Sequence, residues 1–171
     1  MSKRIVVSTI DDPSILAEVL QFQTSKKVVK NRFLKAALTE RTSSYDRNKP
    51  EKCGIPTERL VNLYTKWGHG GFGLICTGNI VVDYKHLESA GNAIIDQRIE
   101  STEHRNAFRK IANAIKSDGS VAIAQLSNAG RQTPITINEH PFSASDVQLK
   151  VMRRGAGSIK QCRTTNSDHN Q

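Results

Sequence analysis

Two stretches of the chain carry apolar residues at helical spacing. The first follows Pro56 and Thr57, and its apolar face consists of Leu60, Val61, Tyr64 and Trp67. The second runs from about Thr102 to Lys116, and its apolar stripe consists of Ala107, Phe108, Ile111, Ala112 and Ile115. Glycines follow both stretches, as is common where a helix ends. The pattern therefore predicts two amphipathic helices.

Three other stretches have the composition of strands. Residues 27–38 combine β-branched and apolar residues and are typical of a hairpin arm that runs into a strand ending at KAALTE, residues 35–40. Residues 72–82 form a nearly continuous apolar run, as in a strand buried on both faces, and residues 121–126 resemble another short buried strand. The alternation of strands and helices predicts an α/β protein with parallel strands joined by right-handed crossovers.

The two ends of the chain differ from this middle part. Asp12 and Pro13 are typical of a helix start, and a first helix is predicted from them because Ile15, Leu16, Val19 and Leu20 follow at helical spacing. Residues 129–147 are rich in turn formers and are predicted to be a loop. Beyond Met152 almost no apolar residue occurs, so we predict a domain over residues 1–152 and a divergent, disordered tail over residues 153–171.

Charge and composition narrow the function classes. The chain has 171 residues, 37% of them hydrophobic and 24% charged, which fits one globular domain. Its formal net charge is +9, but the basic residues are scattered among acids, so we expect no nucleic-acid partner. The densest basic cluster is predicted to be a solvated strand edge, and it consists of Lys26, Lys27, Lys30, Arg32 and Lys35.

Cysteine usage and hydropathy indicate a compartment. The three cysteines are widely spaced and form no C-x-x-C pattern, which favours reduced thiols over a disulfide framework or a metal site. No apolar run has the length of a membrane span or of a signal peptide. We therefore expect a cytoplasmic protein without a membrane partner.

Polar and small residues collect where the predicted strands end. In parallel β/α sheets the carboxyl ends of the strands form the ligand site. The predicted strands deliver to it Ala36, Ala37, Leu38 and Thr39, then Thr77, Gly78 and Asn79, and finally Gln125, Ser127, Asn128 and Arg131. Small side chains allow close approach to a ring, and amide or hydroxyl groups pair with its edge atoms, so this set suits a flat, conjugated ligand.

The same residues also have structural interpretations. Two adjacent alanines are common where a strand packs tightly against a helix, Thr39 is suited to capping a helix or turn, and a backbone group can satisfy Gln125. A small nucleotide-binding protein is disfavoured because the chain has neither a G-x-G-x-x-G nor a P-loop motif.

Three motifs carry a family resemblance. They are KNRFLKAALTE at residues 30–40, GIPTERLVNLYTKWGHGGFGLICTGN at 54–79 with VDYKHLE at 82–88, and AQLSNAGRQTP at 124–134. In this order and at this β/α spacing they resemble the old yellow enzyme family, the flavin-dependent NADH:flavin oxidoreductase or NADH oxidase group. The resemblance covers residues 15–150.

The resemblance implies a fold, a cofactor and a reaction. The family is an eight-stranded β/α barrel that binds FMN noncovalently, takes hydride from NAD(P)H and passes it to an electron-poor alkene or other small-molecule acceptor. By position, Ala36, Ala37 and Leu38 would lie against the isoalloxazine and Thr39 near the flavin carbonyl and N5. Asn79 would lie near the ring edge, and Gln125 would pair with the pyrimidine part.

Two positions depart from the family pattern. Many relatives have a proline where Ala37 stands and a histidine where Asn128 stands. The chain also contains three of the eight barrel strands, and the family's substrate-binding His/Asn pair, proton donor and phosphate site come from later strands. We therefore predict a partial TIM-type (β/α)8 barrel, the first three β/α units behind an N-terminal helix and hairpin, and name no catalytic and no metal-binding residue.

A partial barrel suggests further expectations. The loss of pattern near Arg153 is interpreted as the mark of a truncated product. Four histidines lie in or beside turns, helices or loops and are predicted to be solvated rather than functional: His69, His86, His104 and His140. Unpaired strand edges and an uncovered sheet face favour marginal stability and self-association, or pairing with a complementary barrel fragment. The alternative function is therefore that of a non-catalytic interaction module.

Overall fold

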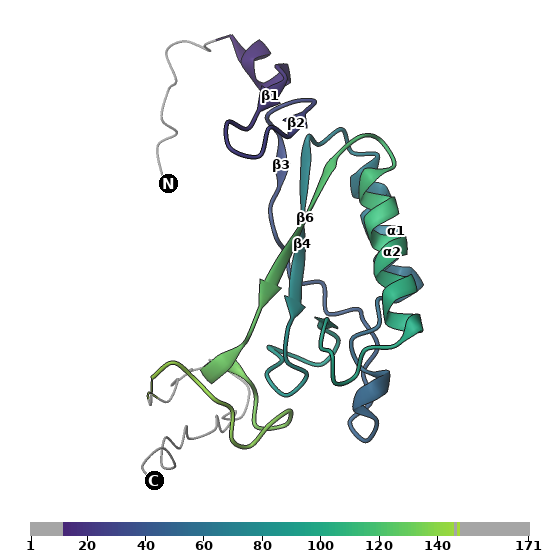
Figure 1. Cartoon of the computed structure of the whole chain (residues 1–171), viewed down its shortest axis with the longest axis vertical. Helices are drawn as coiled ribbons and strands as arrows, with labels where there is room; N and C mark the ends of the chain where they lie inside the picture. The colour runs from purple at the N-terminus through teal and green to yellow at the C-terminus, as the bar shows by residue number, and fades with distance from the viewer. Residues whose placement is uncertain (1–11, 146, 148–171) are drawn as a thin grey trace, which may run out of the picture.

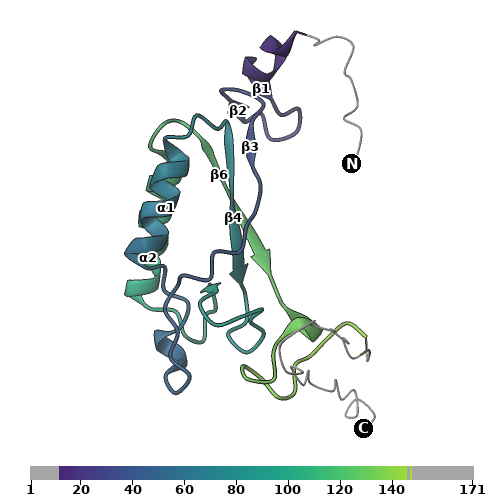
Figure 2. The ribbon, with the colours of Figure 1, turned by 180° about the vertical axis from the view of Figure 1, so that it is seen from behind.

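The fold is a small parallel sheet with two helices on one face. The computed structural model describes residues 12–145 and residue 147. Helices α1 (Glu58–Gly68) and α2 (Thr102–Lys116) run side by side along the same face of the sheet (Figures 1 and 2). The described residues leave the opposite face uncovered, and we call it the open face. Among the described helices none is both long and apolar enough to cross a membrane.

Strand β4 (Leu74–Val81) is the centre of the sheet. It pairs in parallel with β6 (Val121–Ser127) on one side. On the other side of β4, β3 (Leu34–Lys35) pairs with the first residues of β4, and β5 (Ala93–Ile94) pairs with its last residues. The short strands β3 and β5 therefore lie one after the other along the same side of β4. The parallel strands and the two crossover helices confirm the predicted β-α-β order.

Both helices begin and end where the sequence predicts. The side-chain oxygen of Thr57 accepts a hydrogen bond from the Leu60 N–H, and Ser101 accepts one from the His104 N–H, so each helix has a polar N-cap. A glutamate in the first turn and a lysine in the last turn of each helix complement the helix dipole. The two amphipathic helices are therefore confirmed in position and in length.

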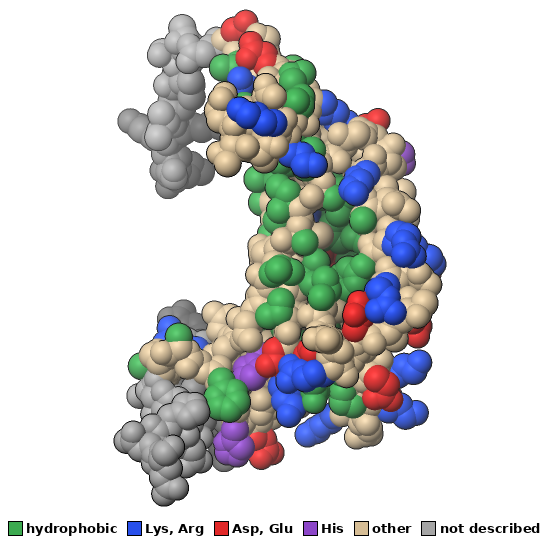
Figure 3. Space-filling model, in the orientation of Figure 1, with side chains coloured by type: hydrophobic (Ala, Val, Ile, Leu, Met, Phe, Trp, Pro, Cys, Tyr) green, Lys and Arg blue, Asp and Glu red, His purple; other side chains and the backbone are tan. Residues whose placement is uncertain are grey.

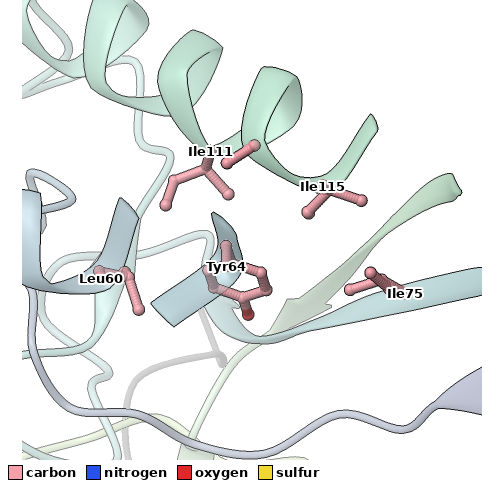
Figure 4. Close-up of a cluster of buried hydrophobic side chains, with 6 residues drawn as sticks. Leu60, Tyr64, Ile75, Ile111 and Ile115 are labelled. Carbon is pink, nitrogen blue, oxygen red and sulfur yellow. The ribbon is translucent and has the colours of Figure 1, made fainter. Parts of the chain in front are cut away.

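The main core lies between these helices and β4. Its buried members are Leu60, Tyr64, Ile75, Ile111, Ala114 and Ile115. Figure 4 shows that side chains of α1 and α2 meet above Ile75 of the central strand. A second cluster, around Val81, Leu87 and Ile94, fills the space at the carboxyl end of the sheet. Most apolar burial therefore lies on the helix-covered face.

The N-terminal part differs from the prediction. The Asp12 side chain caps a start as expected, but only a 3-10 helix forms over η1 (Pro13–Ala17), followed by β1 (Leu20–Gln21). Tertiary packing supplies most helical stability. Ile15 and Val19 are 52% and 61% exposed, so the described part of the chain offers no packing surface for a longer helix. The predicted hairpin is present as β1 paired antiparallel with β2 (Val28–Val29).

Two strand predictions also need correction. The first parallel strand does not reach Leu38 but ends at Lys35, because the chain then passes over Gly78 of β4 without pairing. Strand β6 is not buried: within residues 12–145 it pairs with β4 alone and so lies at the edge of the sheet, and Leu126 is 62% exposed. Residues 129–145 form the predicted loop around a short 3-10 turn, η3 (Gly130–Gln132), and the predicted tail 153–171 lies outside the described residues.

Candidate functional site

A row of polar side chains crosses the carboxyl ends of the three strand segments. The Gln125 Nε2 donates a hydrogen bond to Asn79 Oδ1 at 2.5 Å, and Asn79 Nδ2 donates one to Thr39 Oγ1 at 3.1 Å. The three predicted polar residues come from segments far apart in the chain and are brought into direct contact. We call Thr39, Asn79 and Gln125 the polar row.

The backbone beneath Gln125 is fixed from the strand next to it. Its N–H donates a hydrogen bond to the hydroxyl of Thr77, a buried residue of β4, at 3.0 Å. This bond lies at the register irregularity between β4 and β6, where Asn79 comes opposite Gln125. A side-chain partner therefore satisfies Gln125, and each amide of the polar row keeps capacity for further hydrogen bonds.

The three apolar residues of the predicted site lie between β3 and the polar row. Ala36 is exposed, so it does not take part in the tight strand-helix contact of the alternative interpretation, and Ala37 is half-buried. Leu38 is 59% exposed. This segment of small and apolar side chains borders the polar row directly through the chain, since Thr39 follows Leu38.

The remaining predicted residues lie in the loop after β6. Asn128 Oδ1 accepts a hydrogen bond from the Gly130 N–H at 2.8 Å and so stabilises the turn itself. Arg131 is exposed and lines an open cavity of about 490 Å³ together with Gln132, Phe142 and Ser143. The loop thus provides an accessible cationic group near the end of β6, but it does not contact the polar row through Asn128.

Sequence reasoning missed a buried ionic group on the other face of the sheet. Lys35, predicted to be solvated, has its side chain only 5% exposed and lies 3.7 Å from the carboxylate of Glu40. Burial lowers the pKa of Lys35, and the neighbouring Glu40 opposes that shift. The alternation of side chains along a strand could have predicted the burial of Lys35. Leu34 faces the open side of the sheet, so the next residue, Lys35, faces the helices.

Two histidines predicted to be solvated are buried instead. The His86 ring is held through Nδ1 by Asp83 Oδ2 at 2.7 Å, and its Nε2 accepts a hydrogen bond from the Phe142 N–H at 2.8 Å. His104 contacts the Cys53 carbonyl oxygen through Nε2 at 2.9 Å. Both rings join segments distant in the chain, so their role here is structural.

An ionic cluster fixes the loops at this end of the sheet. Arg98 donates hydrogen bonds to Asp96 and Asp83, and the Tyr84 N–H donates to Asp96 at 3.0 Å. The guanidinium group lowers the pKa of Asp96 to about 2. Burial by itself raises the pKa of Asp83, but hydrogen bonds from the Lys85 N–H, from Arg98 and from His86 outweigh it and lower the pKa.

Comparison with known proteins shows the family of the chain. The model of the NADH:flavin oxidoreductase / NADH oxidase family matches residues 20–166. The NADH-dependent flavin oxidoreductase nadA of Aspergillus parasiticus is 40% identical over 145 residues, which is 84% of this chain and 33% of that protein. An NADH oxidase of Thermoanaerobacter brockii is 29% identical over 127 residues, which is 73% of this chain and 18% of that protein. The chain thus spans about a third or less of the length of these relatives.

Solved structures show the same fold. The old yellow enzyme of Trypanosoma cruzi superposes with a TM-score of 0.68 at 18% identity over 90% of this chain and 43% of that one. The old yellow enzyme homologue of Zymomonas mobilis gives a TM-score of 0.66 at 22% identity, over 90% of this chain and 40% of that one. The described part therefore has the fold of the N-terminal portion of a β/α barrel, and the chain belongs to the NADH:flavin oxidoreductase / NADH oxidase family.

Proposed function

We propose that this chain forms the first part of an FMN site in an oxidoreductase that transfers hydride from NAD(P)H through FMN to an electron-poor alkene or another small-molecule acceptor. The polar row is the observation that carries the proposal. Three amide and hydroxyl side chains from separate segments meet at the carboxyl ends of parallel strands, beside the apolar residues 36–38. Family membership supports the same cofactor.

The residues present fit one part of such a cofactor. Ala36, Ala37 and Leu38 offer a small-sided apolar surface for a planar ring, and the polar row offers donors and acceptors in a line for heteroatoms at the ring edge. When bound, FMN supplies the hydride chemistry. The chain itself binds and orients the ring, and donor groups of Thr39 and Gln125 stabilise negative charge at its edge.

The remaining strands of the barrel belong to the complete site. The chain covers 33% of the Aspergillus relative, and the described residues provide a sheet of four parallel strands, of which β3 and β5 have two residues each. We therefore propose that turnover needs those additional strands, and that this chain alone binds FMN more weakly than a closed barrel. Acceptor binding is assigned to residues beyond the polar row.

An FMN titration of the 171-residue chain tests this proposal. Flavin fluorescence should be quenched in a saturable manner, and Gln125→Ala should weaken FMN affinity about tenfold because a bound edge atom loses its partner. The matched control is Gln97→Ala, which removes an exposed amide far from the polar row in the sequence and should leave the affinity unchanged. Riboflavin in place of FMN separates ring recognition from phosphate recognition.

Two results would contradict the proposal. Equal affinity of the wild-type chain and the Gln125→Ala variant would remove the polar row from the cofactor site. Equal weakening by Gln125→Ala and Gln97→Ala would do the same if circular dichroism shows that both variants are folded.

A second candidate function is pairing with another chain. The open face and the free edge of β6 expose large apolar residues, and in Figure 3 hydrophobic side chains gather over the middle of the molecule, between the hairpin and the loops. Members of this exposed set are Leu34, Leu38, Val82, Ile123 and Leu126. Soluble monomers rarely keep such contiguous patches uncovered. We propose a complementary barrel fragment, or a second copy of this chain, as the partner.

Sedimentation velocity distinguishes the two candidate functions. Concentration-dependent association that Ile123→Lys abolishes would support pairing. A monomer at every concentration that carries bound flavin would favour the cofactor-binding function alone.

We also propose a cytoplasmic location. The two cysteines within the described residues, Cys53 and Cys76, are free thiols, as a reducing compartment maintains them. Fluorescence microscopy of a tagged chain tests this, and a vesicular or extracellular signal would contradict it.

A further inference from the structure

A buried ion pair encloses the apolar segment of the candidate site. Lys35 precedes Ala36, and Glu40 follows Thr39, so the pair stands at the two ends of this four-residue segment. Their side chains are 5% and 10% exposed, with Lys35 Nζ 3.7 Å from Glu40 Oε1. The ion pair between Lys35 and Glu40 thus joins the two ends of the segment 36–39 to each other.

Lys35 has further partners on the helix side of the sheet. Its ammonium group donates a hydrogen bond to the Cys76 carbonyl oxygen of β4 at 3.0 Å. It also lies 3.9 Å from the centroid of the Trp67 ring of α1, at the distance of a cation-π contact. The first end of the segment is therefore fixed to a strand and to a helix at once.

Glu40 is fixed by a different set of groups. The Tyr64 hydroxyl donates a hydrogen bond to Glu40 Oε1 at 2.5 Å, and the same hydroxyl accepts one from the Gly78 N–H at 2.8 Å. Tyr64 is a buried member of the main core, and Figure 4 shows its hydroxyl directed away from α2 (Ile111, Ile115). The second end of the segment is therefore held by the core itself.

Gly78 allows the segment to pass this close to β4. A Cβ atom at this position would lie 2.1 Å from the Leu38 carbonyl oxygen and 2.1 Å from Glu40 Oε2. Thr39 and Glu40 are neighbours, yet Thr39 contacts Asn79 of the polar row while Glu40 contacts Tyr64 in the core. Thr39 of the candidate site and Glu40 of the ion pair are thus consecutive residues, so a shift of one displaces the other.

Stability alone does not account for a buried ion pair here. Removing two charges from water is costly, and apolar replacements of similar volume are often neutral or stabilising. Geometry does account for it, since the pair fixes the ends of a segment that makes no strand pairing of its own. A preorganised segment binds a ligand without ordering cost.

We propose that Lys35 and Glu40 are positioning residues, which hold residues 36–39 in one conformation so that Thr39 and the apolar side chains face the ligand in fixed register. The inference rests on the proposed function only in naming FMN as the ligand. Whether the ion pair orders residues 36–39 can be measured in the chain without any ligand.

The test uses the double variant Lys35→Met/Glu40→Gln in the 171-residue chain. Backbone ¹⁵N relaxation should give order parameters of about 0.8 for residues 36–39 in the wild-type chain and below about 0.6 in the variant. FMN affinity should fall about tenfold while the unfolding midpoint changes little, which is the mark of lost preorganisation. The matched control is Lys110→Met/Glu58→Gln, which removes an exposed ion pair and should change neither readout.

A second variant covers the case in which the double variant fails to fold. Tyr64→Phe keeps the core volume and removes the hydroxyl that joins Glu40 to Gly78, so it should lower the order parameters of residues 36–39 to an intermediate value. Unchanged order parameters in a folded variant would overturn the inference. If the wild-type chain binds no FMN, the proposed function fails, but lower order in the variants still supports the positioning role.

Discussion

The two faces of the parallel sheet have opposite characters. On the helix-covered face, Ile75 of β4 is fully buried under α1 and α2 and belongs to the main core. On the open face, Ile123 of β6 is 40% exposed and Leu38 lies beside the polar row, more than half exposed. Strands that contribute buried residues to one face therefore carry the candidate ligand site on the other.

This separation predicts different effects for substitutions on the two faces. Substitutions on the helix-covered face should change the free energy of unfolding, and substitutions on the open face should change ligand affinity or association. The exception is the crossing at Gly78, where the segment 36–40 contacts both faces.

The largest effect should come from the helix-covered face. Ile75→Ala should lower the free energy of unfolding by about 3 kcal/mol, because it leaves a cavity between β4 and both helices. The same change on the open face, Ile123→Ala, should cost less than about 1 kcal/mol because the side chain is partly solvated already. Urea denaturation measures both, and equal losses would contradict the division between the faces.

A smaller loss should follow substitution at the crossing point. Gly78→Ala should destabilise the chain by about 2 kcal/mol, since the new methyl group would meet the Leu38 carbonyl oxygen and the Glu40 carboxylate. Unlike Ile75→Ala, it should also weaken FMN binding by displacing Thr39. A variant with lower stability and unchanged FMN affinity would show that the segment 36–40 does not couple the two faces.

Low pH should lower the free energy of unfolding through the ionic cluster at the carboxyl end of the sheet, and not through either face. The pKa of Asp96 is about 2 in the folded chain and 3.8 ordinarily, so its ion pair with Arg98 contributes fully above about pH 4. That contribution, at most about 2 kcal/mol, should be lost as the pH falls from about 4 to about 2. Thermal unfolding against pH measures it, and Asp96→Asn should flatten the profile in that window.

The smallest change in stability should come from the exposed edge. Leu126→Lys should alter the free energy of unfolding by no more than about 0.5 kcal/mol, because this side chain is 62% exposed. It should nevertheless reduce self-association, since a charged group on an edge strand opposes pairing. Light scattering at increasing protein concentration checks this, and unchanged association would place the contact elsewhere.

The elements that sequence periodicity predicts best are those that pack against each other. Both helices and β4 follow the pattern because their apolar residues meet in one core. The helix predicted after Asp12 has the same apolar spacing but no described surface to cover, and it forms only a 3-10 turn. Strand β5 was missed since two residues are too few to show a period.

For the candidate site, residue type predicted which polar residues lie together but not all of their contacts. Thr39, Asn79 and Gln125 were expected to share one end of the sheet, and the structure brings them into hydrogen-bonding distance. The prediction that Lys35 is solvated was wrong. It was based on the charge of the side chain, whereas the position of Lys35 in the strand directs that side chain to the helix-covered face. Likewise, the burial of His86 depends on Phe142, which is too distant in sequence for local pattern to reveal.

The long separations within the polar row have a consequence for synthesis on the ribosome. Thr39 and Asn79 are 40 positions apart, and Asn79 and Gln125 are 46 apart. At about 5–20 residues per second, each strand emerges about 2–9 s before its next partner exists. The nascent chain therefore exposes unpaired apolar edges for seconds, and the lysines and arginine from Lys26 to Lys35 are placed where like charge opposes aggregation during that interval.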